Sequence, residues 1–404
     1  MTSTVSSERR PDLDWIRVSA FFLLILYHVG MFYVPWGFHV KTPHPVEALE
    51  PVMLITNPWR LTLLFLVSGA ATRFMADKMS AGGLAKARTA RLLPPLLLAI
   101  FVIVPPQTYF EIVEKLGYAG SVFDFYGKYV TASGHWRPDG APLITPTYNH
   151  MWFVAYLFIY SLILAGLLAV ARPLFARLEA GLDRALSGWG LLVWPTVVFM
   201  ALRMSLFPHF DITHALVDDW YNHALSFGVF VFGFLTAKSE TIKQAFIKIR
   251  WPALALAILG YGFIIYRWTH RMDDSAPEGM MVLARGFYAL DQWGAIAAIL
   301  GFGAKHLTRG GPVLSYLTIG VFPFYIIHQT FIVVAGHYLA QQGLPQGLEA
   351  MILILGTFAC CLLTYEIVRR VNVLRPWFGL KPLARAKYVD GAHPAQIDGR
   401  PVQG

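Results

Sequence analysis

Arg17 and His28 lie eleven residues apart in the first hydrophobic segment of the chain, and both side chains can take part in chemistry. At about 100° per residue, eleven steps make three helical turns plus about 20°, so both side chains lie on one face of a helix. They are about 16 Å apart along its axis. Because a charged or titratable group inside a membrane helix is costly, it usually faces a protein interior or a wet cavity. The spacing therefore predicts a functional lumen on this face.

The two side chains suit different tasks, and we predict that both are catalytic. His28 can act as a base that takes a proton from a hydroxyl during acyl transfer, or it can carry the acyl group itself. Arg17 enters the membrane close to the cytoplasmic surface, where it can contact an anionic donor. The structural alternatives are a histidine bonded to a neighbouring helix and an arginine that extends to the lipid headgroups, with Asp14 as its partner one turn away.

Two further histidines, His150 and His328, are expected at a depth similar to that of His28. His150 precedes Trp152 at the outer end of the fourth hydrophobic segment, and His328 lies in the outer half of the ninth. We predict that His150, Trp152 and His328 bind substrate, although helical wheels do not show whether they face one another. Asp291, a deep acid in the eighth segment, is a further substrate-binding candidate because such an acid is either paired or functional. No His pair at i,i+4 and no carboxylate spacing supports a metal, so we expect none.

Arg88 and Arg91 form an Arg-x-x-Arg pair just before a pair of prolines. At this spacing both side chains can face one side of a helical turn. Two guanidinium groups suit phosphate recognition because each offers a planar fork of hydrogen-bond donors. The two arginines are therefore candidates for cofactor binding, and ordinary anchoring by positive charge on the cytoplasmic side is the alternative.

The composition indicates a polytopic, all-α membrane protein. The 404 residues are 56% hydrophobic and only 14% charged, against about 25% charged in a soluble domain. The formal net charge of +9 does not indicate a nucleic-acid partner, because the basic residues fall in alternate loops. The two cysteines, Cys360 and Cys361, are adjacent in an apolar run and imply neither a disulfide framework nor a metal site.

Ten segments are apolar enough and long enough to span a hydrocarbon core of about 30 Å. The third contains four prolines, so we expect its helix to be kinked or broken. The ten segments are 14–34, 56–76, 92–110, 151–171, 189–207, 222–237, 252–268, 285–303, 313–336 and 347–368.

Basic residues gather in one set of alternate loops and acidic residues in the other. The positive-inside rule then places both termini in the cytoplasm, with an even number of spans. We expect one transmembrane domain over residues 1–385, in a bacterial inner membrane, followed by a disordered cytoplasmic tail over 386–404. The loop from about 111 to 150 would lie outside, and its aromatic residues either bind sugar rings or form an interfacial belt.

These residues together resemble the acyltransferase 3 family of integral membrane acyltransferases, over nearly the whole chain. The ending of the chain, from Tyr365 to Lys381, resembles the branch of that family that succinylates osmoregulated periplasmic glucans. The residues that carry the family resemblance are Leu13-Asp14 with Arg17 and His28 (the first-helix signature), Phe65-Leu66-Val67-Ser68-Gly69 (Phe-x-x-Ser-Gly), Arg88 with Arg91 (Arg-x-x-Arg), His150-Met151-Trp152-Phe153-Val154 (His-Leu-Trp-Phe-Leu, with Met151 and Val154 in place of the leucines) and Phe324 to Gln329 (Tyr-x-x-His-Gln).

The resemblance implies a cytoplasmic acyl-CoA donor and an acceptor hydroxyl on the outer side. Arg88 and Arg91 would hold the CoA phosphates, Arg17 would help to position the donor, and His28 would act as base or transient acyl carrier. We therefore predict an O-acyltransferase that moves a small acyl group, succinyl or acetyl, onto an extracytoplasmic carbohydrate. Direct transfer and an acyl-histidine route both stay open.

Two other classes of function fit the same residues. A secondary transporter or glycan exporter would also have buried charges and broken helices, and a sensor or scaffold would use the histidines for packing or for a pH response. The acceptor is open among glucan, lipopolysaccharide, exopolysaccharide, a peptide and an antibiotic. The acyl group is open too, because succinyl differs from acetyl by one carboxylate, whose partner could be any of several basic residues, including Arg60, Arg203, Arg267 and Arg285.

Overall fold

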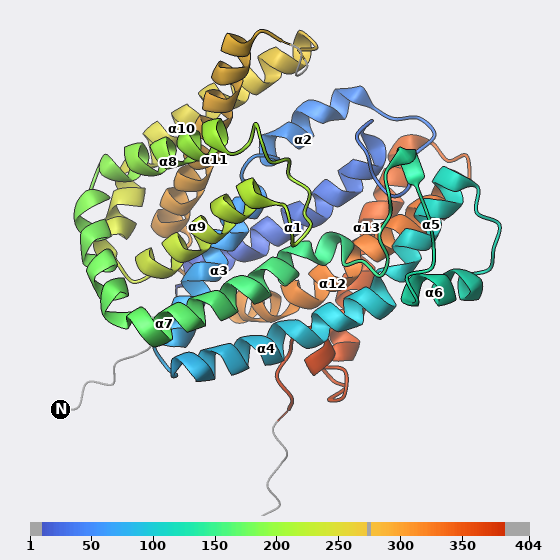
Figure 1. Cartoon of the computed structure of the whole chain (residues 1–404), viewed down its shortest axis with the longest axis horizontal. Helices are drawn as coiled ribbons and strands as arrows, with labels where there is room; N and C mark the ends of the chain where they lie inside the picture. The colour runs from blue at the N-terminus through green and yellow to red at the C-terminus, as the bar shows by residue number, and fades with distance from the viewer. Residues whose placement is uncertain (1–9, 273–275, 384–404) are drawn as a thin grey trace, which may run out of the picture.

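The computed structural model describes residues 10–272 and 276–383, and the regular structure of these residues is helical throughout (Figure 1). The predicted tail, 386–404, lies outside the described residues. The α-helices are α1 (Pro11–Tyr33), α2 (Glu50–Thr56), α3 (Arg60–Ala76), α4 (Ala81–Leu98), α5 (Pro105–Leu116), α6 (Val122–Val130), α7 (Trp152–Ala185), α8 (Gly190–Ser205), α9 (Trp220–Thr236), α10 (Glu240–Thr269), α11 (Glu278–His306), α12 (Pro312–Ala340) and α13 (Gln346–Val368). Short helical turns are η1 (Glu47–Leu49), η2 (Ala99–Ile103), η3 (Pro138–Gly140), η4 (Asn149–Met151) and η5 (Pro376–Phe378).

Each of the ten predicted spans falls on one of these helices or on a joined pair of them. In the described part of the chain, 7 helical stretches are long and apolar enough to cross a membrane. The chain is therefore a multi-pass membrane protein, while the count of ten stays a prediction because α8, α9 and α11 do not meet both criteria. The 7 stretches are Pro11–Tyr33, Glu47–Ala76, Ala81–Leu116, Asn149–Ala185, Glu240–Thr269, Pro312–Ala340 and Gln346–Val368.

Loops that the charge pattern assigns to the same side of the membrane contact one another. On the basic side, Lys238 Nζ lies 2.9 Å from Asp77 Oδ2. On the acidic side, the indole of Trp268 donates to a Glu50 carboxylate oxygen at 2.9 Å. Two sets of loops at two rims of the helix bundle agree with the alternation in charge, while the assignment of the basic rim to the cytoplasm stays a prediction.

The proline-rich third segment is broken by a π-helical turn, as predicted. α4 continues through the first proline pair, and the break comes at η2, directly before Pro105. Because Pro105 has no N–H, the carbonyl of Phe101 lacks its helical donor, and the hydroxyl of Tyr126 donates to it at 2.9 Å. The hydroxyl of Thr330 donates to the Ile103 carbonyl at 2.6 Å. The break is thus satisfied by side chains, and α5 resumes in contact with α12.

α3 and α9 cross so closely that both helices need glycine at the crossing. A Cβ atom on Gly69 would lie 1.9 Å from the carbonyl oxygen of Phe230, and one on Gly233 would lie 2.0 Å from that of Leu66. Because both oxygens belong to the backbone, neither can move aside as a side chain would. The glycine of the Phe-x-x-Ser-Gly segment therefore serves close helix packing.

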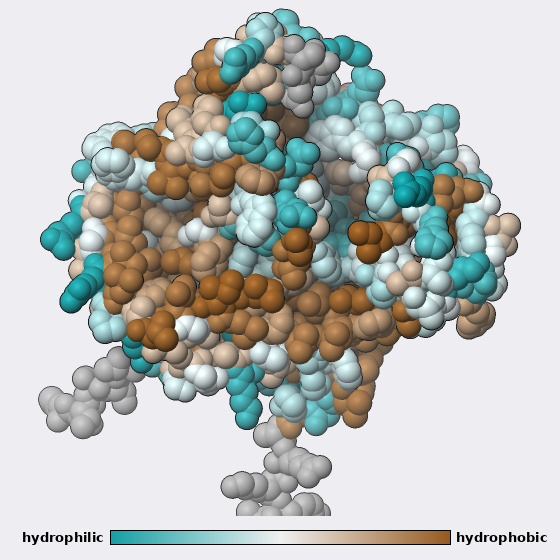
Figure 2. Space-filling model, viewed as in Figure 1, coloured by the Kyte–Doolittle hydropathy of each residue, from teal (hydrophilic) through white to brown (hydrophobic). Residues whose placement is uncertain are grey.

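α1 lies inside the bundle and contacts α3, α11, α12 and α13 (Figure 1). The exterior looks different: Figure 2 shows an apolar band that crosses the face over α4 and α7, with hydrophilic residues gathered above and below it. Such a band is what a lipid-facing surface requires. α1 is therefore positioned to carry groups that face the protein interior.

Candidate active site

Three histidines from distant parts of the chain meet near the C-terminal end of α1. His28 Nδ1, on α1, lies 2.9 Å from Nε2 of His328, on α12. The ring of His150, in η4 at the start of α7, lies 5.2 Å from the ring of His328, centroid to centroid. Helical wheels left this juxtaposition open, and packing brings the three rings together.

The hydrogen bonds of His328 determine which nitrogens carry the protons in neutral rings. His328 Nδ1 lies 2.7 Å from the carbonyl oxygen of Tyr325, which can only accept, so Nδ1 carries the proton and Nε2 is an acceptor. His28 must then donate to His328 through its own Nδ1. Nε2 of His28 is left unprotonated, without a hydrogen-bond partner among the described residues. A general base requires this state.

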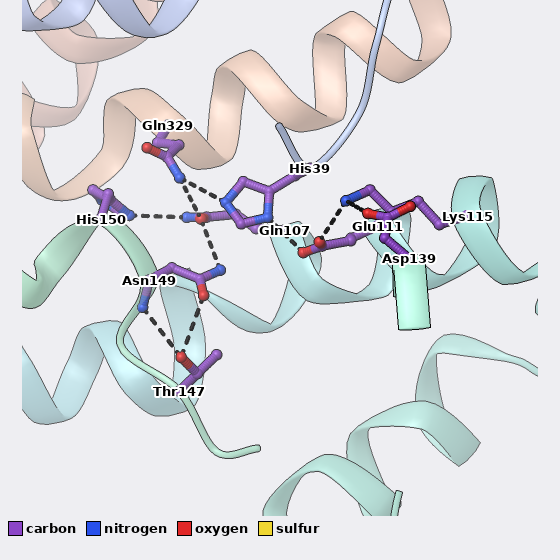
Figure 3. Close-up of polar contacts among 9 residues, drawn as sticks. All are labelled: His39, Gln107, Glu111, Lys115, Asp139, Thr147, Asn149, His150 and Gln329. Carbon is purple, nitrogen blue, oxygen red and sulfur yellow. Dashed lines mark hydrogen bonds and ion pairs between the residues drawn. The ribbon is translucent and has the colours of Figure 1, made fainter. Parts of the chain in front are cut away.

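His150 is held on one side by the amide of Gln107 (Figure 3) and on the other by a backbone carbonyl. Its Nε2 donates to the carbonyl of Ile326 at 3.1 Å, and the amide nitrogen of Gln107 donates to its Nδ1 at 3.3 Å. The Gln107 oxygen in turn accepts from Asn149 and from Gln329, both at 3.2 Å. Since both ring nitrogens are engaged, His150 is less free than His28 to take a proton, and it suits positioning better.

The same network reaches outward to the segment that follows α1 (Figure 3). Gln329 donates to Nε2 of His39 at 3.0 Å, and His39 Nδ1 lies 2.6 Å from a Glu111 oxygen. The preceding residue, Phe38, stacks on His28 with its ring centroid 6.5 Å away and an angle of 20° between the rings. Anchoring His39 therefore holds an aromatic ring beside the candidate base.

A cavity of about 470 Å³ opens beside His28. His150 and Trp152 also line it, and the loops before α7 and α9 supply further polar and aromatic side chains. Figure 2 shows the surface hollowed beside these loops. The Trp152 ring stacks on His214, 4.2 Å between centroids, and burial lowers the pKa of His214 below its ordinary value. The part of the cavity wall that Trp152 and His214 form is thus aromatic and largely uncharged.

Arg60 is the charged side chain of this cavity, and the sequence alone does not distinguish it from Arg203, Arg267 and Arg285. It begins α3, it is only 6% exposed, and its Cζ lies 3.4 Å from the centroid of the Tyr27 ring. Its Nη1 donates to Oδ1 of Asn57 at 3.0 Å. The position of Arg60 at the outer end of the second segment matches the depth of His28, but sequence does not show which way the side chain points.

Arg17, Arg88 and Arg91 lie away from the cavity, near the other end of α1. Arg17 pairs with Asp14 at 3.1 Å, which is the partner predicted from their spacing. Arg88 is buried and donates to the hydroxyl of Thr72, whereas Arg91 is exposed. The three positive charges repel one another, so an anion bound among them would relieve that repulsion.

Asp291 does not belong to the histidine cavity. It lines a separate groove of about 770 Å³ that borders a different face of α1, with residues of α2, α3, α10 and α11 among its other walls. The residue is 2% exposed, and its Oδ2 has no hydrogen-bond partner in the described structure. Across residues 10–272 and 276–383, no group of three or more His, Cys, Asp and Glu side chains is placed to hold a metal ion.

Comparison with known proteins points to one family. The sequence model of the acyltransferase 3 family, described as an acyltransferase domain, matches residues 10–366. The chain is 20% identical to the glucans biosynthesis protein C of Escherichia coli O81 (strain ED1a), over 94% of this chain and 97% of that protein. The proteins of the same name from Escherichia coli O9:H4 (strain HS) and from strain ATCC 8739 match to the same extent, 20% identity over 94% and 97%. No solved structure matches the chain.

Proposed function

Because the chain belongs to the acyltransferase 3 family, we propose that this membrane O-acyltransferase moves a small acyl group, acetyl or succinyl, from cytoplasmic acyl-CoA to a hydroxyl of an extracytoplasmic glycan. The observation that carries the proposal is the hydrogen-bonded pair of His28 and His328 at the edge of a cavity. This arrangement leaves one imidazole nitrogen of His28 available as a base where a hydroxyl can reach it.

In direct transfer, the acceptor hydroxyl donates its proton to His28 Nε2 while its oxygen attacks the carbonyl carbon of the thioester. The tetrahedral intermediate then collapses, the carbon–sulfur bond breaks, and the leaving thiolate takes the proton from His28. His328 holds the Nδ1–H of His28 throughout and steadies the transient imidazolium, as the third member of a catalytic triad does. In the acyl-histidine route, Nε2 attacks the thioester first and the CoA thiolate leaves. The acceptor hydroxyl then attacks the acyl carbon, the carbon–nitrogen bond to His28 breaks, and the hydroxyl proton passes to the thiolate. The hydrogen bond to His328 orients His28 in both steps.

In this proposal, one end of α1 binds the acyl donor and the other end binds the acceptor. Arg17, Arg88 and Arg91 form a cationic end that suits the phosphates of CoA, since guanidinium groups offer paired donors to phosphate oxygens. The histidine end opens into a cavity with aromatic walls, among them Phe38 and Trp152, against which a sugar ring can stack. The relatives are named for glucan biosynthesis, so a glucan is the acceptor that we propose to test first.

The test is acyl transfer by the purified, reconstituted protein given acetyl-CoA or succinyl-CoA with a periplasmic glucan extract. We expect CoA release that needs the acceptor and that is matched by a gain of acyl mass on the glucan. His28→Ala should lower both by about 10²- to 10⁴-fold, whereas His306→Ala, a matched histidine variant that lines the Asp291 groove, should leave both unchanged. Glucan flux across vesicles without acyl-CoA, and no CoA release with either donor, would contradict the proposal in favour of a transporter.

A further inference from the structure

We infer that Arg60 binds a carboxylate at the far end of the transferred acyl group, so that the donor is an acyl thioester ending in a carboxylate. This inference rests on the proposed function and adds the donor class and the residue that selects it. Arg60, Arg203, Arg267 and Arg285 are among the several basic residues that could pair with such a carboxylate, and the structure separates these four by position.

Arg60 is a buried cation that lacks a countercharge. None of the ion pairs in the described structure involves it, and its Nε is buried without a hydrogen-bond partner. The side chain is held from two sides, by the face of the Tyr27 ring and by Oδ1 of Asn57, which also accepts from the Tyr27 hydroxyl at 3.2 Å. The guanidinium is therefore fixed in place while part of its donor fork is unused. Leaving a buried charge unpaired is costly, which is why such groups normally have a partner or a function.

Among the four arginines, Arg60 is the one that lines the cavity of His28. Arg203 is the closest match in environment: it is 8% exposed, its Cζ lies 3.4 Å from the ring of Tyr288, and it donates to the hydroxyl of Tyr221 at 3.0 Å. It does not line the cavity. Burial and an aromatic partner are thus common to both arginines, and access to the candidate base distinguishes Arg60.

The depth of Arg60 also fits an acyl group that is being transferred at His28. Arg60 stacks on Tyr27, the neighbour of His28 on α1, and the rings of these two residues lie 6.2 Å apart. A thioester carbonyl beside His28 Nε2 would leave the remainder of a short acyl chain to extend across the cavity. A terminal carboxylate on that chain can reach the guanidinium and form the paired hydrogen bonds that suit arginine.

A competing role for Arg60 is to stabilise the oxyanion of the tetrahedral intermediate. That anion exists only during the reaction, so the buried guanidinium would be uncompensated while the donor waits in the site. A carboxylate on the donor would compensate the charge in the bound ground state as well. The two roles also differ in measurable consequence, because an oxyanion forms with every donor and a distal carboxylate exists on some donors only.

The experiment compares succinyl-CoA, acetyl-CoA and the uncharged isostere succinamoyl-CoA on wild-type protein, Arg60→Gln, Arg60→Lys and the matched control Arg203→Gln. Wild-type protein should use succinyl-CoA best. Arg60→Gln should lower kcat/KM for succinyl-CoA by about 10- to 100-fold, the usual effect of losing a charged hydrogen bond, and should lower it far less for the two uncharged acyl groups. Arg60→Lys should keep part of the preference, and Arg203→Gln should keep all of it.

Equal losses with all three donors in Arg60→Gln would overturn the carboxylate role and favour the oxyanion role. So would a wild-type protein that uses succinamoyl-CoA as well as succinyl-CoA. If Arg60→Gln does not fold, the wild-type comparison of these two isosteric donors still decides the question. Failure of the proposed function looks different, because wild-type protein would then release no CoA from any of the three donors.

Discussion

Two hollows border α1 on neighbouring faces, and they differ in how their polar groups are satisfied. In the cavity beside Leu24 and His28, polar groups form two hydrogen-bonded sets, the His28–His328 pair and the amide network around His150, and one nitrogen of His28 is left available. The groove beside Ile16 and Leu23 is larger, about 770 Å³ against about 470 Å³, but it is nearly all apolar, and one oxygen of Asp291 has no partner there. Size therefore does not identify the reactive hollow. The reactive hollow is identified by its hydrogen-bonded polar groups, because acid–base chemistry needs groups that are held in defined protonation states.

The difference between the two hollows is tested most directly by removing Nε2 of His28. We expect His28→Ala to lower the transfer rate by about 10²- to 10⁴-fold, the range that general-base catalysis supplies, in protein that still inserts and folds. His306→Ala, in the groove, is the matched control and should transfer at the wild-type rate. The readout is CoA release per folded protein. Normal transfer by His28→Ala would remove the catalytic role of this histidine.

The next largest effect should come from the residue that orients His28. We expect His328→Ala to reduce kcat by about 10²-fold with little change in KM for the donor, because the His28 ring would lose the acceptor that fixes its tautomer. Steady-state kinetics with varied donor concentration provide the measurement. A large rise in donor KM with kcat unchanged would instead indicate that His328 contacts the substrate.

Substitutions at the cationic end of α1 should weaken binding of the acyl donor and leave the acyl-transfer step unchanged. We expect Arg88→Gln combined with Arg91→Gln to weaken acyl-CoA binding by about 10-fold, the value of one lost charged hydrogen bond, and to leave glucan binding unchanged. Binding titrations of the reconstituted protein with each substrate would show this. Donor affinity equal to that of wild type would return the two arginines to simple membrane anchoring.

In the groove lined by Asp291, a substitution should change the stability of the protein and not its activity. We expect Asp291→Asn to leave the transfer rate within about twofold of wild type and to raise the unfolding temperature. Burying a carboxylate with an unpartnered oxygen is more costly than burying a neutral amide of the same shape, by about 1 kcal/mol or more. A thermal melt and the transfer assay on the same sample make the comparison. A loss of transfer would show that Asp291 binds substrate after all, as its depth in the sequence first indicated.

The smallest effect concerns the segment that places Phe38 against His28. Burial, with the charge of Lys115 nearby, lowers the pKa of Lys41 from 10.5 to about 8. Between pH 8 and 10.5 the folded protein has therefore released a proton that the unfolded chain still holds, so stability rises with pH across this window. We expect the unfolding temperature of wild type relative to Lys41→Gln to increase between pH 8 and pH 10. A difference that is constant with pH would contradict this account.

Hydropathy and charge were sufficient to predict the long apolar helices and the two sets of loops, because both properties repeat along the sequence, but the short helix α6 lies inside the predicted loop 111–150. The break in the third segment could be predicted from its prolines, because a proline has no N–H to donate to the preceding helical turn. The break lies at Ala99–Ile103, just before Pro105. The depth of His28, His150 and His328 could also be counted along their segments. These are properties of one helix at a time.

The contacts between helices could not be predicted in this way. The pairing of His28 with His328 depends on the rotation of α1 relative to α12, 300 residues further along the chain. Arg60 and Arg203 are equivalent in sequence, and only packing turns Arg60 toward the cavity. Asp291 has the depth of a site residue, but its helix directs it to the other hollow. In each case the missing information is which face of a helix meets which neighbour.

The most direct test of the central claim is transfer across a membrane. Reconstituted vesicles would hold the glucan inside and receive acyl-CoA outside, and mass spectrometry would follow acylation of the enclosed glucan for wild type, His28→Ala and His306→Ala. We predict acylated glucan in the lumen for wild type and His306→Ala, and acylation that is slower by about 10²-fold or more for His28→Ala. Acylation that proceeds equally in all three proteins would contradict the assignment of His28 as the group through which the acyl transfer takes place.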